Sequence, residues 1–510
     1  MRLPRPVTAA AASSIALAAA LGGSGVLGGS AAVGGSGVLA GAAGAGVLPP
    51  AAGRPAAGSG PAVLISPDAV HVGVGLRAAP STAFCERHYR IACYQPAQLQ
   101  QAYHLRALYR SGITGAGQTI VIVDSYGSPT VRHDLAVFDR AEGLPAPPSL
   151  KIIQPAGKVA PYKPNGNREG WAGETTLDVE YAHAIAPRAA ILVVETPTAE
   201  NEGRSGFPRI VQAEKYVIDH HLGGVISQSF SATEQTFATP QRLLTLRGAI
   251  VDAARKGVTI LAASGDSGAA DLQYNGASYY LRPVTSWPDS DPLVTGVGGV
   301  QLHLAAAGNR AAAPTVWNDT YNTATNEFID GGKGPNPLAG GGGKSAVFAR
   351  PGYQNAVRAV VGASRGVPDI AMSAACNGAV DVYQSFAGQK AGWYPTCGTS
   401  EATPEFAGIV ALADQAAGHP LGLINPALYQ LSLARAPGLV DVVSGNSTVS
   451  FTQGGKEHRV TGFRARRGYD LATGTGTVNA ARFVPELALL AGHPRWSTAK
   501  LTAALRRLDG

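Results

Sequence analysis

The sequence lacks the features that mark several large classes of protein. Only 15% of its 510 residues are charged, and beyond the N-terminal region no stretch of 18 uninterrupted apolar residues occurs, so we expect no stable membrane insertion. Lysine and arginine never occur in runs longer than two. The net charge of +7 is therefore spread over the chain, and we expect no nucleic-acid partner. No Cys-x-x-Cys spacing is present, which argues against a cysteine-based metal site.

The usual signs of a catalytic histidine are also absent. None of the 11 histidines stands in a His-Gly-Thr or similar glycine-framed setting. His183 lies inside an expected helix, and His220 and His221 precede a Gly-Gly helix stop, so each is better explained as a packed or surface residue. A hydrolase of the Ser-His-Asp type is therefore hard to build from this chain. A lipase or esterase is disfavoured because no Gly-x-Ser-x-Gly elbow has a suitable histidine downstream.

What the N-terminal region does contain predicts export. Arg2 and Arg5 precede a short apolar stretch, the pattern of a secretory signal peptide, which we assign to residues 1–30. The apolar stretch is about 15 residues long, against the roughly 20 that a spanning helix needs, so an uncleaved anchor is the second choice. Residues 31–62 are a low-complexity Gly/Ala linker that we expect to be disordered. We therefore expect a secreted, extracellular protein.

Four cysteines fit an oxidising compartment. Cys85 and Cys93 lie eight residues apart, and Cys376 and Cys397 lie 21 apart. Four cysteines allow three pairings, and spacing does not choose among them; we predict the sequential pairing over the alternative of four buried thiols. The second bond would fix the chain just before Ser400 and contribute about 3 kcal/mol on the loop-entropy model.

From about residue 106 the sequence alternates between two patterns. Buried strands are predicted at four apolar runs: 118–124, 189–195, 223–230 and 257–268. Helical stretches lie between them at 174–186, ended by Pro187, and at 208–221. This alternation predicts an α/β fold with a mainly parallel sheet covered by helices on both faces. Functional side chains in such folds gather beyond the carboxyl ends of the strands.

The same patterns divide the chain into regions. We expect a lead-in at 63–105 that carries the first cysteine pair, one large catalytic domain at 106–485, and a helical tail at 486–510. The lead-in is too short for a full prodomain. No nucleotide or redox motif is evident, because the glycine cluster at 296–300 is at best a weak phosphate loop.

The stretch CGTSEATPEFAG, residues 397–408, suits a serine nucleophile at the start of a helix. A hydroxyl there faces the partial positive charge of the helix N-terminus, although helix capping alone would also explain Ser400. Pro404 fits the first helical turn under either interpretation. Serine is a poor nucleophile until a base removes its proton, so another group must serve Ser400.

Carboxylates are the candidates for that role. Glu174 and Asp178 stand at i and i+4 on one helix face, which on an exposed helix would mean nothing, but in a cleft would let one act as base while the other orients it. Asp266 lies in the Ser-Gly-Asp turn after an apolar strand, where a protonated carboxyl could donate to a developing oxyanion. Asp124 closes the first strand where the acid of a triad would stand, but its histidine is missing. Glu180 points to another helix face and is expected at the surface.

Three motifs resemble those of the sedolisins, the serine-carboxyl peptidases. In chain order they are the Glu174/Asp178 pair, the Ser-Gly-Asp turn with Asp266 and the Gly-Thr-Ser stretch with Ser400. The resemblance covers roughly residues 106–480. It extends through three further segments: VISQSF at 225–230, FARPGYQ at 348–354 and VPDIAMSA at 367–374. The resemblance implies a subtilisin-like fold in which a glutamate replaces the histidine. Ser400 would be the nucleophile, Glu174 the general base that Asp178 orients, and Asp266 the oxyanion acid. It also implies activity favoured by acid.

The resemblance further implies one structural Ca²⁺ near the end of the domain. Asp441 and Asp470 would supply carboxylate oxygens, and Val442, Arg466 and Gly468 backbone carbonyls, an oxygen-only set that suits Ca²⁺. Two aspartates that cap turns are the alternative. Arg466 stands where the family usually has glycine.

The sequence departs from the family's pattern at three further points. The lead-in is shorter than the usual prodomain, Met372 and Ser373 replace an acidic pattern, and Cys397 immediately precedes Gly398. We nevertheless expect a monomeric, secreted endopeptidase that cleaves polypeptides. The alternatives are a tripeptidyl-type exopeptidase and a non-catalytic secreted binding protein on a peptidase fold.

Overall fold

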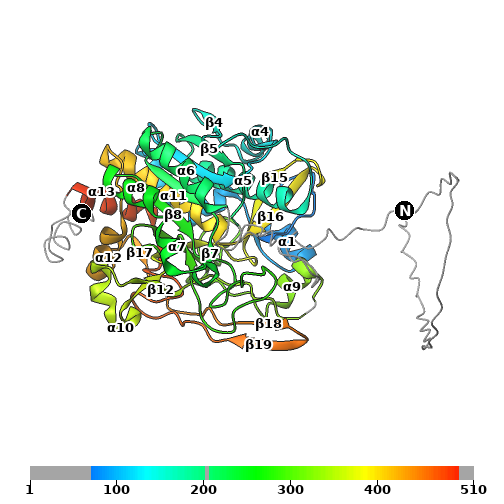
Figure 1. Cartoon of the computed structure of the whole chain (residues 1–510). Coiled ribbons are helices and arrows are strands. Elements are labelled where there is room, and N and C mark those ends of the chain that lie inside the picture. Colours follow the sequence, from blue (N-terminus) through cyan, green and yellow to red (C-terminus); the bar gives the residue numbers. More distant parts are fainter. Residues whose placement is uncertain (1–69, 201–205, 333, 493–510) are drawn as a thin grey trace, which may run out of the picture. The chain divides into compact units, whose positions relative to one another are not determined.

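A mainly parallel sheet forms the centre of the molecule in the computed structural model, which describes residues 70–200, 206–332 and 334–492 (Figure 1). Its eight strands follow the order β11-β10-β8-β6-β3-β5-β4, with β14 also paired to β10. The pairings are parallel except that of β11 with β10. The strands are β3 (Thr119–Ser125), β4 (Leu150–Ile153), β5 (Ala190–Thr196), β6 (Val225–Gln228), β8 (Thr259–Ala263), β10 (Thr295–Gln301), β11 (Thr315–Val316) and β14 (Ile370–Ser373).

Helices cover both faces of this sheet. Because side chains alternate along a strand, Ile120 and Ile122 of β3 pack into one apolar cluster while Val121 and Val123 pack into another. The first cluster contains residues of α5 (Gly166–Ile185) and α11 (Thr399–Ala417), and the second contains residues of α6 (Phe207–Asp219) and α8 (Gly248–Lys256). The predicted α/β class with helices on both faces is confirmed.

The expected strands and helices are present with shifted ends. The largest shift is in α5, which begins at Gly166 rather than at residue 174. Asn165 caps it by accepting a hydrogen bond from the Arg168 amide at 3.1 Å. The glycines in the first two turns of α5 hide its helical pattern in the sequence, because glycine is a poor helix former.

A smaller sheet carries the lead-in onto the domain. Its order is β1-β16-β15-β2, from β1 (Val70–His71), β2 (Cys93–Tyr94), β15 (Ala379–Gln384) and β16 (Gly392–Cys397). β1 pairs antiparallel with β16, the strand that runs into Ser400, and β2 pairs parallel with β15. The described lead-in residues thus belong to the same compact unit as the residues that follow.

The remaining elements surround these two sheets, with the β18–β19 hairpin at the edge opposite β4 and α4 in Figure 1. They are α1 (Thr82–Tyr89), α2 (Pro96–Ala102), α3 (Leu105–Arg110), α4 (Val131–Glu142), α7 (Pro240–Leu244), α9 (Thr323–Asp330), α10 (Arg358–Val361), α12 (Asn425–Ala434), α13 (Ala480–Gly492), β7 (Ala232–Thr233), β9 (Ser286–Trp287), β12 (Gly343–Ala349), β13 (Ser364–Val367), β17 (Leu439–Val440), β18 (Val449–Gln453), β19 (Lys456–Val460) and β20 (Thr477–Val478).

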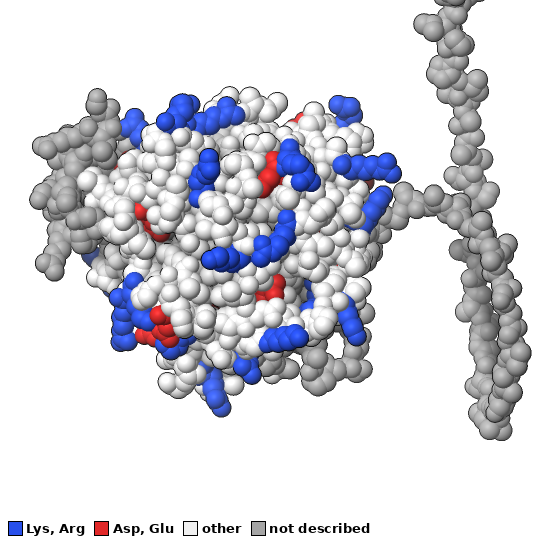
Figure 2. Space-filling view, turned by 90° about the horizontal axis from the view of Figure 1, so that it is seen from above, with Lys and Arg blue, Asp and Glu red and all other residues white. Residues whose placement is uncertain are grey.

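Several expectations concern residues that the structure does not describe. The predicted signal peptide at 1–30, the linker at 31–62 and most of the tail at 486–510 lie outside the described residues. Among the helices that are described, none has the length and apolar character to cross a bilayer. On the face shown in Figure 2, Lys and Arg side chains are spread over the surface singly and in small groups, and they form no single stripe.

Both predicted disulfides are present in the structure. Cys85 bonds to Cys93, which joins α1 to β2, and Cys376 bonds to Cys397, which joins the segment after β14 to the end of β16. The second bond therefore fixes the chain three residues before Ser400.

Candidate active site

Ser400 lies in the first turn of α11, and the backbone before it is shaped by glycine. Gly398 has φ 135°, a conformation that residues with a side chain rarely adopt, and its amide donates to the Ala374 carbonyl at 2.9 Å. Ser400 is completely buried. The predicted placement of a serine at a helix start, near the carboxyl ends of the parallel strands, is what the structure shows.

Glu174 and Asp178 come from α5, which packs directly against α11. The two helices approach so closely that a Cβ on Gly408 would stand 2.6 Å from the Ile185 Cβ. Both carboxyls are fully buried, and Asp178 accepts a hydrogen bond from the Ser229 hydroxyl at 2.9 Å. The predicted i, i+4 pair thus faces the protein interior beside the nucleophile, whereas an exposed pair would face solvent.

The pKa of Glu174 is raised well above its ordinary value. Burial is the largest cause, followed by repulsion from Asp178 and Asp124, while the neighbouring Ser400 hydroxyl acts in the opposite direction. The Ser400 hydroxyl and the Glu174 carboxyl are adjacent without completing a hydrogen bond of normal geometry, a bond that in active sites commonly tightens only with substrate present. Glu174 can therefore hold a proton in acid and still contact the nucleophile.

Asp124 adds a third carboxyl to this group. It lies near the carboxyl end of β3, fully buried, and burial raises its pKa to about 7. It also raises the pKa of Asp178, which is already raised by burial, while hydrogen bonds from Ser229 and Glu174 oppose that shift. The three acids lie in one buried region, where Asp124 disfavours the ionised forms of both Glu174 and Asp178.

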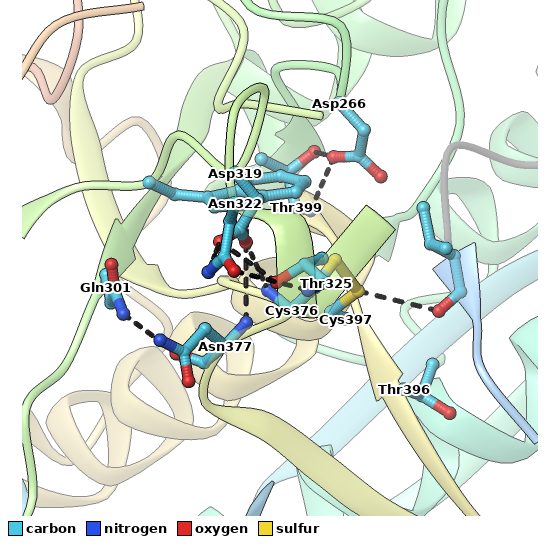
Figure 3. The surroundings of a disulfide bond; sticks show 12 residues. Asp266, Gln301, Asp319, Asn322, Thr325, Cys376, Asn377, Thr396, Cys397 and Thr399 are labelled. Carbon is cyan, nitrogen blue, oxygen red and sulfur yellow. Dashed lines mark hydrogen bonds between the residues drawn. A yellow bond between two sulfur atoms is a disulfide. The ribbon is translucent and has the colours of Figure 1, made fainter. Parts of the chain in front are cut away.

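Asp266 contacts the residue before the nucleophile from the turn after β8. Its Oδ1 accepts hydrogen bonds from the Thr399 amide at 2.7 Å and the Thr399 hydroxyl at 2.8 Å (Figure 3). The Thr399 hydroxyl lies 3.1 Å from the Gly265 amide, which donates to it. The residue before Ser400 thereby locks the Ser-Gly-Asp turn to the start of α11.

A network around the Cys376–Cys397 disulfide fixes the approach to α11. Asp319 accepts a hydrogen bond from the Cys376 amide at 3.0 Å and another from the Trp317 indole N–H at 2.9 Å (Figure 3). Asp319 is itself buried, with its pKa raised by that burial. The disulfide, this carboxyl and the Gly398 turn together define where α11 begins.

His71 also reaches this site. It belongs to β1, stands opposite Thr396 of β16, and places its Nε2 at 4.0 Å from a Glu174 carboxylate oxygen. Gly173 makes room for the imidazole, because a Cβ there would lie 2.8 Å from the His71 Cε1. Burial lowers the pKa of His71 to about 4, so the ring is neutral above that pH and the contact with Glu174 is not an ion pair there.

The candidate calcium ligands gather around the loop 466–470. Asp441 accepts from the Gly468 amide at 2.9 Å, and Asp470 accepts from the Arg466 amide at 2.9 Å as well as from Ala472 and Thr473. Val442, one of the three residues predicted to offer a backbone carbonyl, is buried and follows Asp441 in the chain. Two carboxylates and neighbouring carbonyls are hard oxygen donors, which fit a divalent cation of the Ca²⁺ type.

Sequence reasoning placed the main groups but missed several neighbours. Ser229 follows the strand β6 and could have been found as a polar residue at a strand end. His71 gave no signal, because its partner Glu174 is 103 residues away in the chain and no pattern links them. Glu180 is fully buried and accepts from the Tyr383 amide, so its expected surface position is wrong; its helix face packs against β15.

The chain is similar to known peptidases over most of its described length. Residues 156–454 match the model of the subtilase family. Kumamolisin from Bacillus sp. (strain MN-32) is 31% identical over 401 residues, which cover 77% of this chain and 63% of the relative; sedolisin from Pseudomonas sp. (strain 101) is 28% identical over 374 residues, which cover 73% and 58%. The chain thus spans about three fifths of the length of these curated relatives.

A solved structure supports the same likeness. Pseudomonas sedolisin, a serine-carboxyl proteinase complexed with two molecules of pseudo-iodotyrostatin, aligns with a TM-score of 0.63 at 25% sequence identity. The alignment covers 79% of this chain and 99% of the solved chain. The arrangement of sheet and helices is therefore the subtilisin-like one that the motifs predict.

Proposed function

The chain belongs to the sedolisins of the subtilase family, with a subtilisin-like α/β fold, and from this we propose that it is a serine-carboxyl endopeptidase that hydrolyses polypeptides. The observation that carries the proposal is the position of Ser400 next to the buried Glu174 carboxyl, with Asp266 hydrogen-bonded to Thr399 at the helix start. A serine so placed has a carboxylate where other serine peptidases have a histidine.

In the acylation step Glu174, in its ionised form, takes the proton of the Ser400 hydroxyl as the oxygen attacks the peptide carbonyl. Asp178 holds Glu174 in orientation and shares its proton, and Ser229 in turn holds Asp178 by a 2.9 Å hydrogen bond. Glu174 then returns the proton to the leaving amine, and a water molecule hydrolyses the acyl-enzyme by the reverse route.

Asp266 acts on the carbonyl oxygen. A negatively charged oxygen develops there in the tetrahedral intermediate, and only a protonated carboxyl can donate a hydrogen bond to it. Thr399 fixes the Asp266 side chain by two hydrogen bonds to Oδ1. Catalysis then needs Asp266 protonated while the Glu174–Asp178 pair is short of at least one proton, so the rate depends on pH through both conditions.

A tripeptidyl-type exopeptidase is the second candidate, because human tripeptidyl-peptidase 1 is 30% identical over 328 residues of this chain. A mixed peptide library, digested from about pH 3 to about pH 8 and read by mass spectrometry, separates the two. Internal cleavage that is lost in Ser400→Ala and in Glu174→Gln supports the endopeptidase. Products confined to N-terminal tripeptides assign the exopeptidase, and cleavage that survives Glu174→Gln removes Glu174 from the role of base.

Two further parts of the proposal concern the setting of the enzyme. Export as a secreted protein is supported by the two disulfides, which persist in oxidising compartments. One structural Ca²⁺ would be held by the carboxylates of Asp441 and Asp470 with the carbonyls of Val442, Arg466 and Gly468, and it would stabilise the loop rather than take part in catalysis. Arg466 and Asp470 line one pocket, and a guanidinium close to the ion would weaken its binding.

A further inference from the structure

A second pair of carboxyls lies directly behind the nucleophile. Glu401 and Glu405 stand four residues apart in the first turns of α11, the first of them adjacent to Ser400, and both are fully buried. Neither oxygen of Glu401 completes a hydrogen bond of normal geometry within the described residues. The mechanism above uses neither residue.

A chain of contacts connects this pair to the strand beneath the site. Glu405 accepts a hydrogen bond from the Tyr103 hydroxyl at 3.0 Å, and the same hydroxyl accepts one from the Ser373 amide at 2.8 Å. Ser373 ends β14, three residues before Cys376, whose disulfide partner Cys397 precedes α11. The first turn of α11 is therefore held from two sides, by the disulfide and by the Glu405–Tyr103–Ser373 contacts.

The charges around the pair are mostly of one sign. Glu401 faces Glu405 on its own helix and Asp266 from the turn after β8. Its remaining titratable neighbours are Tyr94, Tyr103 and Tyr181. The guanidinium of Arg310 lies near Tyr103 and lowers its pKa, against the larger effects of burial and of Glu405. Burial and then mutual repulsion raise the pKa of Glu401, and burial raises that of Glu405 against the hydrogen bonds from Tyr103 and Ser373.

Such a pair is a poor choice for stability alone. Taking carboxyls out of water costs free energy, and buried ionisable groups can often be replaced by neutral ones of similar volume without loss of stability. Buried acids with neighbours that perturb them gather at functional sites. The position next to Ser400 and Asp266 therefore points to catalysis.

We infer that Glu401 and Glu405, with Tyr103, form a positioning unit that holds the first turn of α11, so that Ser400 faces Glu174 while Thr399 engages Asp266. The unit touches no substrate atom. This inference rests on the proposed peptidase function. It also implies that ionisation of the pair as pH rises places charge behind the nucleophile and loosens the turn.

The test compares Glu401→Gln and Glu405→Gln with Glu214→Gln, a buried carboxyl on α6 whose pKa burial raises to about 8 and which packs on the opposite face of the sheet. We expect kcat to fall about tenfold in the first two variants with KM within about twofold, because misplacing a catalytic group slows chemistry more than binding. Glu401→Asp, which restores a titratable carboxyl, regains part of kcat. Glu214→Gln leaves kcat unchanged.

Two results would overturn the inference. One is a kcat in Glu401→Gln and Glu405→Gln equal to that of the wild type. The other is a loss of kcat in Glu214→Gln as large as in Glu401→Gln and Glu405→Gln, with the same fall in Tm. That result would mean that the pair only contributes to the stability of the fold. Tyr103→Phe removes only the linking hydroxyl, so its kcat tests the same inference should a glutamine variant fail to fold.

A measurement without peptides separates this inference from the proposed function. The rate at which a phosphonofluoridate labels the serine reports the reactivity of Ser400 directly. If the wild type is labelled but cleaves no peptide, the proposed function fails, and slower labelling in Glu401→Gln and Glu405→Gln still supports the positioning unit. Equal labelling rates in wild type and variants overturn it, and a wild type that is not labelled overturns both.

Discussion

Two carboxyl pairs with the same spacing lie on either side of Ser400, one on α5 and one on α11. Glu174 and Asp178 meet hydroxyl groups, those of Ser400 and Ser229, so a proton can pass between the pair and the nucleophile. Glu401 and Glu405 meet each other and Tyr103, so a proton can be held but has no reacting group to go to. Spacing at i, i+4 and burial therefore do not determine the role of a carboxyl pair. The groups that each carboxyl faces determine it.

The two pairs should differ most in the effect of a substitution at Glu174 on kcat. We expect Glu174→Gln to lower kcat about 10²–10⁴-fold, because the amide cannot accept the Ser400 proton, whereas the matched change at Glu401 costs only about tenfold. Progress curves with one internally cleaved peptide at a fixed acidic pH measure both. Similar losses in the two variants would mean that the pairs are not functionally distinct.

The second prediction concerns the dependence of stability on pH, in which the two pairs should behave alike. Their pKa values are raised in the fold, as are those of Asp124, to about 7, and Glu214, to about 8, so the native protein binds protons that the unfolded chain releases. Stability is therefore greatest below the unfolded pKa of about 4 and falls as pH rises toward the folded values.

Thermal unfolding at a series of pH values measures this effect. We expect the wild-type Tm to fall between about pH 4 and about pH 7. The double variant Glu401→Gln/Glu405→Gln should lose about 1–3 kcal/mol less of its free energy of unfolding over that interval, because it lacks two of the titrating groups. A wild-type Tm that rises over the interval would contradict the assigned directions of the pKa shifts.

A third prediction concerns Ser229, whose hydroxyl donates a hydrogen bond to Asp178 of the first pair. Ser229→Ala removes the hydrogen bond that favours ionised Asp178, so the pKa of Asp178 rises further and activity begins at a higher pH. We expect a loss of about 1–1.5 kcal/mol of transition-state stabilisation at acidic pH, that is, roughly a tenfold lower kcat/KM. Ser231→Ala, two residues along, is the control and should leave the acid limb of the pH profile in place.

The smallest effect is expected far from both pairs, at the loop 466–470. Removing Ca²⁺ with a chelator should lower Tm while leaving the ratio of Glu174→Gln to wild-type activity unchanged, because the ion only stabilises the fold. Arg466→Gly should bind Ca²⁺ a few-fold more tightly, since it removes a positive charge from the pocket that Asp470 lines. A titration calorimeter reads the affinity, and no heat with either protein would remove the metal from the proposal.

The two carboxyl pairs differ in how much of their setting could be predicted from the sequence. The α/β class, the alternation of strands and helices, the helix start at Ser400 and the turn with Asp266 after an apolar strand followed from periodicity and motifs, because these depend on neighbours in the chain. Burial of Glu180 did not, since it depends on β15, some 200 residues later. His71 escaped notice for the same reason.

Glu401 and Glu405 show a different limit. Their spacing stands in the sequence directly after Ser400, yet an i, i+4 pair of acids on a helix most often faces solvent. Only the packing of Tyr103 and Ser373 against α11 turns that face inward. The sequence shows the spacing of Glu401 and Glu405, but it does not show that their helix face is buried.

If substrate peptides also pair with β16, the strand β1 competes with them for its edge. It lies on the edge of β16, through backbone pairing of the kind by which extended peptides join a sheet, and its His71 stands over Glu174. About ten residues tether it to α1, so it is present at an effective concentration of the order of millimolar. A free peptide that uses the same edge must exceed that concentration or wait for β1 to leave. Intact chains and chains trimmed within β1 would then share one kcat while differing in apparent KM.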